Sequence, residues 1–217
     1  MVLDAFGPFA AVFPQGELDV PGYLELLHLA EPSAQIVLDR IEVALAAGDP
    51  RSSLDALFDD PNWRPHLVGA VALVLDGGRH LSTASLWRAV DAGSWVTPQL
   101  IVSAYFVDPA FPAHCRLRVE RGAPIAVPVG SSPAERHSAT GPSGTTRRSA
   151  KLMASLVAVG LRVRVLAPWL ETHRATAAVA DLVALDEDGS ADIADRWHDA
   201  LVRQLAQRGR ALVPVAE

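Results

Sequence analysis

Proline recurs in the first half of the chain directly after residues that can cap a helix. The four pairs are Asp49-Pro50, Asp60-Pro61, Thr97-Pro98 and Asp108-Pro109. An Asp or Thr side chain can accept a hydrogen bond from an N–H of the first helical turn, where these groups have no partner within the helix. Proline is tolerated at the next position because the N–H that it lacks would have been unpaired. These pairs predict several short helices with defined starts.

The apolar residues between these prolines recur at the spacing of an amphipathic helix. Val37, Ile41 and Leu45 form one such stripe, because residues four apart lie on one helical face. Residues 66–75 and 98–107 are apolar nearly all round, which predicts central helices covered on both sides. Their valine content would also suit strands, but their small residues and the proline-marked starts favour helices.

A repeat joins two of these predicted helix pairs. The apolar pattern of residues 54–58 recurs 32 residues later at 86–90, and Trp63 recurs as Trp95 at the same offset. Over residues 20–121, approximately, the chain resembles the HEAT-type helical repeats. The resemblance implies a short α-solenoid-like stack of helix hairpins, and such stacks usually serve as protein-binding scaffolds.

The second half of the chain opens with a segment whose composition opposes regular structure. Residues 123–149 are rich in Pro, Gly and Ser and predict a linker or a long loop. The chain then divides into a helix-hairpin region at 1–122, this segment, and a C-terminal group of helices at 150–217 packed on the first region. Within the last part, residues 161–166 fit either a helix or an alternating strand, and both stay open. The predicted fold class is all-α.

Composition and charge exclude several classes of protein. Of the 217 residues, 50% are hydrophobic, which excludes a chain that is disordered throughout. The formal net charge of −6 argues against a nucleic-acid partner. Cys115 is the only cysteine, so an internal disulfide is excluded. The N-terminus has no basic leader, and no apolar run approaches the roughly 20 residues of a membrane span. We therefore expect a cytoplasmic protein without a membrane partner, and self-association is left open.

Charge is distributed unevenly along the chain. Residues 111–174 carry 10 basic and 3 acidic side chains, whereas residues 1–110 carry 5 basic and 14 acidic ones. The basic segment can dock on acidic parts of the same chain, which is the interpretation that we favour. It can also hold an anionic ligand, for which the candidate residues are Arg116, Arg118, Arg147 and Arg148.

The sequence contains no motif for catalysis, metal binding or cofactor binding. Its seven histidines form no His-Glu-x-x-His pattern, and a single cysteine cannot supply a structural zinc site. Residues 141–148 are rich in Gly, Ser and Thr but lack the Gly-Lys-Ser/Thr ending of a phosphate-binding loop. We therefore expect neither a metal nor a cofactor, and we assign no catalytic residue.

Two matched turns carry residue types that often anchor partner proteins. One contains Trp63, Arg64 and His66, and the other contains Trp95 and Gln99. Trp and Arg dominate the binding energy at many protein interfaces, although repeated aromatic residues more often pack between helices. The sequence predicts a non-catalytic protein-binding or scaffold module with an unknown protein partner. The alternative is an enzyme acting on an anionic small molecule between the two helical regions.

Overall fold

Every regular element among the described residues is a helix. The computed structural model describes residues 3–13, 22–47, 50–79, 83–121, 142–162, 166–174 and 176–210. Its 3-10 helices are η1 (Leu3–Val12) and η2 (Gly22–His28). The α-helices are α1 (Ala34–Ala46), α2 (Arg51–Asp59), α3 (Trp63–Asp76), α4 (Thr83–Asp91), α5 (Thr97–Val107), α6 (Phe111–Glu120), α8 (Pro142–Arg162), α9 (Ala167–Arg174), α10 (Ala177–Ala184) and α11 (Ser190–Gln207). The predicted all-α fold class is confirmed for this part of the chain.

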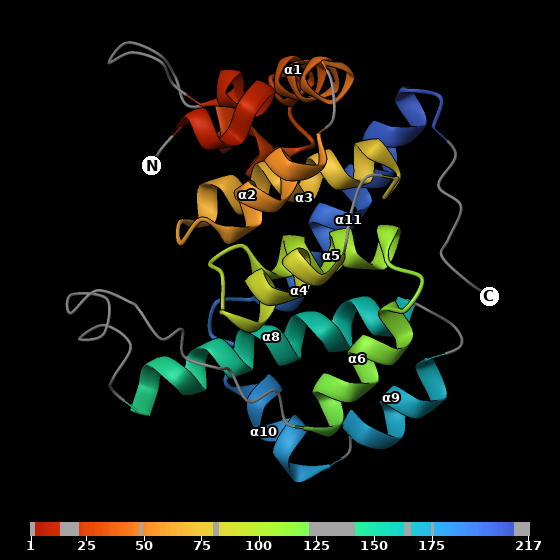
Figure 1. Ribbon diagram of the computed structural model, residues 1–217. Coiled ribbons are helices and arrows are strands. Elements are labelled where there is room, and N and C mark those ends of the chain that lie inside the picture. The colour runs from red at the N-terminus through yellow and green to blue at the C-terminus, as the bar shows by residue number, and fades with distance from the viewer. Residues whose placement is uncertain are drawn as a thin grey trace.

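Helices α3 and α5 form the centre of the molecule. Every residue from Pro65 to Leu75 and from Thr97 to Ala104 is buried. Helix α3 packs against α5, and α5 packs in turn against α8, while α2 and α4 cover α3 and α5 respectively (Figure 1). This arrangement confirms the central helices predicted from two segments that are apolar nearly all round.

The helix pairs α2–α3 and α4–α5 occupy the positions that the sequence repeat aligns. Helices α2 and α4 are each nine residues long, and they pack against one another as well as against their own partners. Figure 1 shows the helices in successive levels, from η1 and α1 at the top to α9 and α10 at the bottom. The solenoid-like continuation of these two pairs stays a prediction.

The acidic side chains before the prolines accept hydrogen bonds one turn earlier than the sequence predicts. Asp60 Oδ1 accepts from the N–H of Asn62 at 2.7 Å, and Asn62 then caps α3, which begins at Trp63. Asp108 Oδ1 likewise accepts from an N–H two residues on, at 2.9 Å, before α6 begins. Each Asp therefore stabilises the turn that leads into the helix, because proline places the chain in that turn first.

Helix α8 begins inside the segment that the sequence assigns to a linker or loop. Residues 142–149 are helical, contrary to the prediction for 123–149, and residues 122–141 lie outside the described part of the chain. Proline is tolerated in the first turn of a helix. The low helix propensity of Gly, Ser and Thr costs at most about 1 kcal/mol per residue, which the packing of the buried residues that follow can offset.

The C-terminal end of α8 answers part of the alternative left open for residues 161–166. Residues 161–162 are helical, and residues 163–165 lie outside the described part. Gly160 is also helical, since α9 packs closely there: a Cβ at Gly160 would lie 2.6 Å from Leu170 Cδ1. The single helix predicted from Pro168 to about Leu185 is instead two helices, α9 and α10. They are separated where Thr176 adopts an extended conformation.

Helix α11 returns from the C-terminal group to the N-terminal part of the molecule. It packs against both α5 and α8. The indole Nε1 of buried Trp197 donates to the Leu26 carbonyl at 2.8 Å, and Gln204 Nε2 donates to the Leu29 carbonyl at 2.6 Å. Because η2 ends at His28, α11 supplies donors to carbonyls at the end of η2 that would otherwise lack partners within the helix.

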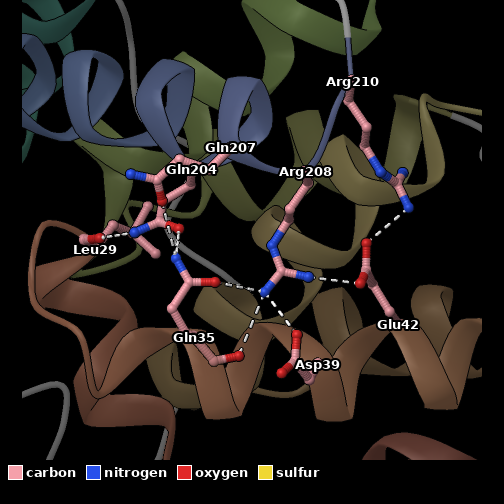
Figure 2. A network of polar contacts seen from close by, with 8 residues as sticks. All are labelled: Leu29, Gln35, Asp39, Glu42, Gln204, Gln207, Arg208 and Arg210. Atoms are coloured by element: carbon pink, nitrogen blue, oxygen red, sulfur yellow. Dashed lines mark hydrogen bonds and ion pairs between the residues drawn. The ribbon is translucent and has the colours of Figure 1, made fainter.

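The C-terminal end of α11 is joined to α1 by a network of charged and amide side chains (Figure 2). Arg208 Nη2 donates to Asp39 Oδ1 at 2.7 Å, and its Nη1 donates to Glu42 Oε2 at 2.5 Å. Arg210 Nη2 donates to the other oxygen of Glu42 at 2.7 Å. The side chain of Gln35 also bonds to this end of α11. The network fixes where α1 lies relative to the last helix.

We expect Trp197→Ala to lower the free energy of unfolding by about 3–5 kcal/mol, because it leaves a cavity between α11 and η2 and an unpaired carbonyl at Leu26. Urea unfolding measures the change. Leu185→Ala, at an exposed position, is the control and should change the stability by less than about 0.5 kcal/mol. A loss below about 1 kcal/mol for Trp197→Ala would show that α11 does not hold η2 in place.

Candidate functional site

Trp95 is the most exposed aromatic side chain of the described residues, with 58% of its surface accessible. It lies in the turn between α4 and α5, and its ring centroid is 4.9 Å from that of half-buried Trp63, with 47° between the ring planes. The repeat therefore brings the two predicted tryptophans into direct contact. Burial differs between them, so that Trp63 supports Trp95 from the side and Trp95 faces outward.

Two cations flank this tryptophan pair. The guanidinium carbon of Arg64 lies 5.0 Å from the centroid of the Trp63 ring, and Lys151 Nζ lies 5.4 Å from that of Trp95. Both distances are within the range of a cation–π interaction. Arg64 is further fixed by donating from Nε to the Tyr23 hydroxyl at 2.9 Å. We call Trp63, Arg64, Trp95 and Lys151 the tryptophan surface.

The backbone around Trp95 is held by the turn that precedes α5. Gly93 has a φ of 76°, a conformation that glycine adopts without strain. Ser94 Oγ accepts from the N–H of Val96 at 3.4 Å, and Thr97 Oγ1 donates to the Ser94 carbonyl at 2.5 Å. This fixed turn reduces the conformational entropy that Trp95 would lose on binding a partner.

His66 and Gln99, which the sequence places beside the tryptophans as partner-binding residues, are buried and cannot reach a partner. Each is only 5% exposed. His66 lies between Ser94 Oγ at 2.8 Å from its Nδ1 and the Asp60 carbonyl at 2.7 Å from its Nε2. It therefore supports the turn from beneath. A repeat register shows that two positions are equivalent but not which side of the helix pair they face.

Burial lowers the pKa of His66 below its ordinary value, outweighing the hydrogen bond to the Asp60 carbonyl that raises it. The neutral ring fits its two contacts, with Nε2–H donating to the carbonyl and Nδ1 accepting from the Ser94 hydroxyl. Protonation would leave Nδ1 without an acceptor role towards Ser94, so the folded turn requires the neutral imidazole.

The four arginines proposed to bind an anion do not converge. Arg118 donates to both oxygens of Asp91, at 2.7 and 2.6 Å, and its guanidinium carbon lies 4.1 Å from the Trp87 ring centroid. Arg116, two residues earlier on α6, faces the Trp169 ring instead, at 5.7 Å. Arg148 packs beside Gly93, and the side chain of Arg147 lies outside the described part. The described arginines therefore give no support to the alternative of an enzyme acting on an anion.

Ion pairs instead join the basic segment to acidic parts of the same chain. Besides Arg118 with Asp91, Arg162 of α8 donates to Asp195 at 2.8 Å and to Asp199 at 3.0 Å on α11. These pairs agree with the favoured interpretation of the charge pattern, in which the middle of the chain docks on acidic neighbours.

Three further titratable groups lie away from the tryptophan surface. His114 Nδ1 lies 2.8 Å from Oδ2 of buried Asp108, which also accepts from Trp87 Nε1 at 2.7 Å. Burial lowers the pKa of His198 and raises the pKa of the Cys115 thiol to about 12. No group of three or more metal-ligating side chains occurs among the described residues. These groups are held by structural partners within the fold.

Lys151 is the residue of the tryptophan surface that sequence reasoning missed. It lies 56 residues after Trp95, in another helix, and no local pattern connects the two. It is the single lysine in a chain with 18 arginines, and that singularity is the only signal that could have drawn attention to it.

Comparison with known proteins finds no family model, curated protein or solved structure that matches the chain. Across the described residues, no helix is both long enough and apolar enough to span a membrane. The tryptophan surface therefore carries the functional assignment.

We expect Trp95→Ala to change the free energy of unfolding by less than about 1 kcal/mol, because the side chain is mostly exposed. Trp63→Ala should cost about 2–3 kcal/mol, since that ring packs on Tyr23 as well as on Trp95. Thermal and urea unfolding of the two variants separate these outcomes. Equal large losses would show that Trp95 is a wedge within the fold rather than a surface residue.

We expect the wild-type protein to lose stability as the pH falls below about 6.5, the ordinary pKa of histidine, because the unfolded chain then binds a proton that folded His66 does not. His66→Gln should show a shallower loss between pH 7 and pH 5, although it is less stable at pH 7. His198 is present in both proteins, so the difference between the two urea-unfolding series isolates His66. Identical slopes would contradict a buried neutral imidazole.

Proposed function

We propose that this chain is a non-catalytic protein-binding module whose partner docks on the tryptophan surface. The observation that carries the proposal is Trp95, a large aromatic side chain that is mostly exposed yet fixed by Trp63 and by the turn beneath it. Exposed, preorganised aromatic residues contribute large contact areas at a small entropic cost, which is why they anchor interfaces.

The charges beside the tryptophans indicate the chemistry of the partner. Arg64 and Lys151 lie on either side of the ring pair, and α8, which supplies Lys151, contains no acidic residue. The chain as a whole carries a net charge of −6, so this surface is a local exception. A partner segment with acidic side chains next to an apolar one would complement it.

The predicted architecture fits a scaffold role. Two helix pairs, α2–α3 and α4–α5, present Trp63 and Trp95 at equivalent turns. A solenoid-like stack of HEAT-type hairpins, as proposed from the repeat, would expose such turns along one edge. The proposal of a short stack and the proposal of a binding edge therefore support each other.

The experiment is capture of proteins from the cell of origin on the immobilised chain, with Trp95→Ala and Lys151→Glu as variants. A genuine partner is retained by the wild type and by Leu185→Ala, which removes an exposed apolar side chain elsewhere. We expect Trp95→Ala to weaken its affinity by about 2 kcal/mol or more, roughly 30-fold. A partner held equally by all four proteins would contradict the proposed surface.

A further inference from the structure

The outward face of α1 carries the two most exposed aliphatic side chains among the described residues. Ile36 is 60% and Val43 is 70% accessible. At 100° per residue, these two positions share one face of α1 with Arg40 and Ala47. Single exposed apolar residues are ordinary on a protein surface, but two of them seven residues apart form a stripe along the helix.

The stripe is bordered by the chain's own elements and covered by none of the described ones. On one side, Pro8 and Ala11 of η1 meet Ala44 and Ala47 of α1 around a shallow, mostly apolar hollow of about 390 Å³. On the other side, Asp39 is held by Arg208 of α11 (Figure 2). The surface is therefore fixed in place on both borders and bare between them.

The pattern along this face is complementary to itself. In two antiparallel helices related by a twofold axis between positions 39 and 40, position 36 faces position 43 and position 39 faces position 40. That axis places Ile36 against Val43 of the second copy, and Asp39 against Arg40 of the second copy. The apolar pair and the oppositely charged pair thus share one centre of symmetry. We infer that α1 is the interface of a twofold-symmetric, antiparallel homodimer.

The charged groups are in the states that this pairing requires. Asp39 accepts from Arg208 through Oδ1, which leaves Oδ2 for a second donor, and its side chain is 68% accessible. Arg40 is exposed and has no ion-pair partner within the part of the chain that the structure describes. An isologous interface uses each pairing twice, so both Asp39–Arg40 pairs form at once. A heterologous partner would not require this symmetry.

The size of the face sets the expected strength. Helix α1 has 13 residues, and at 1.5 Å per residue it is about 20 Å long. One helix pair bordered by η1 buries less surface than a standard stable interface. The dimer is therefore weak and reversible, with a dissociation constant in the micromolar range or above.

Sedimentation equilibrium at physiological salt, from about 5 µM to about 1 mM protein, tests the dimer. The wild type should shift from monomer to dimer across this range. Val43→Asp buries a charge against Ile36 of the other copy, and Arg40→Glu sets carboxylates against each other. Each should raise the dissociation constant at least about 10-fold. Leu185→Asp, the matched exposed control, should leave it unchanged.

A monomer at every concentration overturns the inference, whether or not a different protein binds this face. An equal effect of Leu185→Asp and Val43→Asp also overturns it. Circular dichroism melts of the variants confirm that each protein is folded, as expected for substitutions at exposed positions.

Cross-linking tests the register. An oxidised mixture of Ile36→Cys and Val43→Cys proteins should form disulfides between the two variants. Neither variant alone should link efficiently, because equal positions lie about 10 Å apart along the axis, beyond disulfide reach. Cys115 is buried and supplies the same low background in every sample. Efficient linking of one variant alone, or none in the mixture, would exclude this antiparallel arrangement.

Discussion

The complete burial of α3 and α5 is the constraint on which the rest of the structure depends. A helix satisfies its own backbone hydrogen bonds, but these two carry apolar side chains all round and must be covered on every side. Helices α2 and α4 cover one side, and α8 and α11 cover α5 from another. Contact is close where it occurs: a Cβ at Gly69 of α3 would lie only 2.9 Å from the Phe58 ring of α2.

The last helix completes that cover and thereby decides which surfaces remain bare. Trp197 and Gln204 donate to carbonyls at the end of η2, and Arg208 holds Asp39 and Glu42 of α1. These contacts orient α1 with its apolar stripe outward. The tryptophan surface lies elsewhere, where α8 meets the turn between α4 and α5. The two surfaces are thus separate consequences of one packing arrangement, and a partner on one does not require a partner on the other.

Part of the candidate site followed from the sequence because a repeat relates equivalent positions. The offset of 32 residues paired Trp63 with Trp95, and their rings are in contact. The same offset could not show that His66 and Gln99 point inward, since the direction of a side chain depends on which neighbouring helices cover it. Lys151 could not be predicted at all, because its contact with Trp95 arises only when α8 packs beside the turn.

Local chemistry determined which segments are helical and which helices are central. Hydrogen bonds at Asp60 and Asp108 and apolar runs such as residues 66–75 act over a few residues, so the sequence displays them directly. Tertiary structure alone decided that α8 extends back to Pro142, that α11 returns to η2 and α1, and that Trp95 faces outward. These features depend on contacts between residues far apart in the chain, and such contacts leave no pattern in the local sequence.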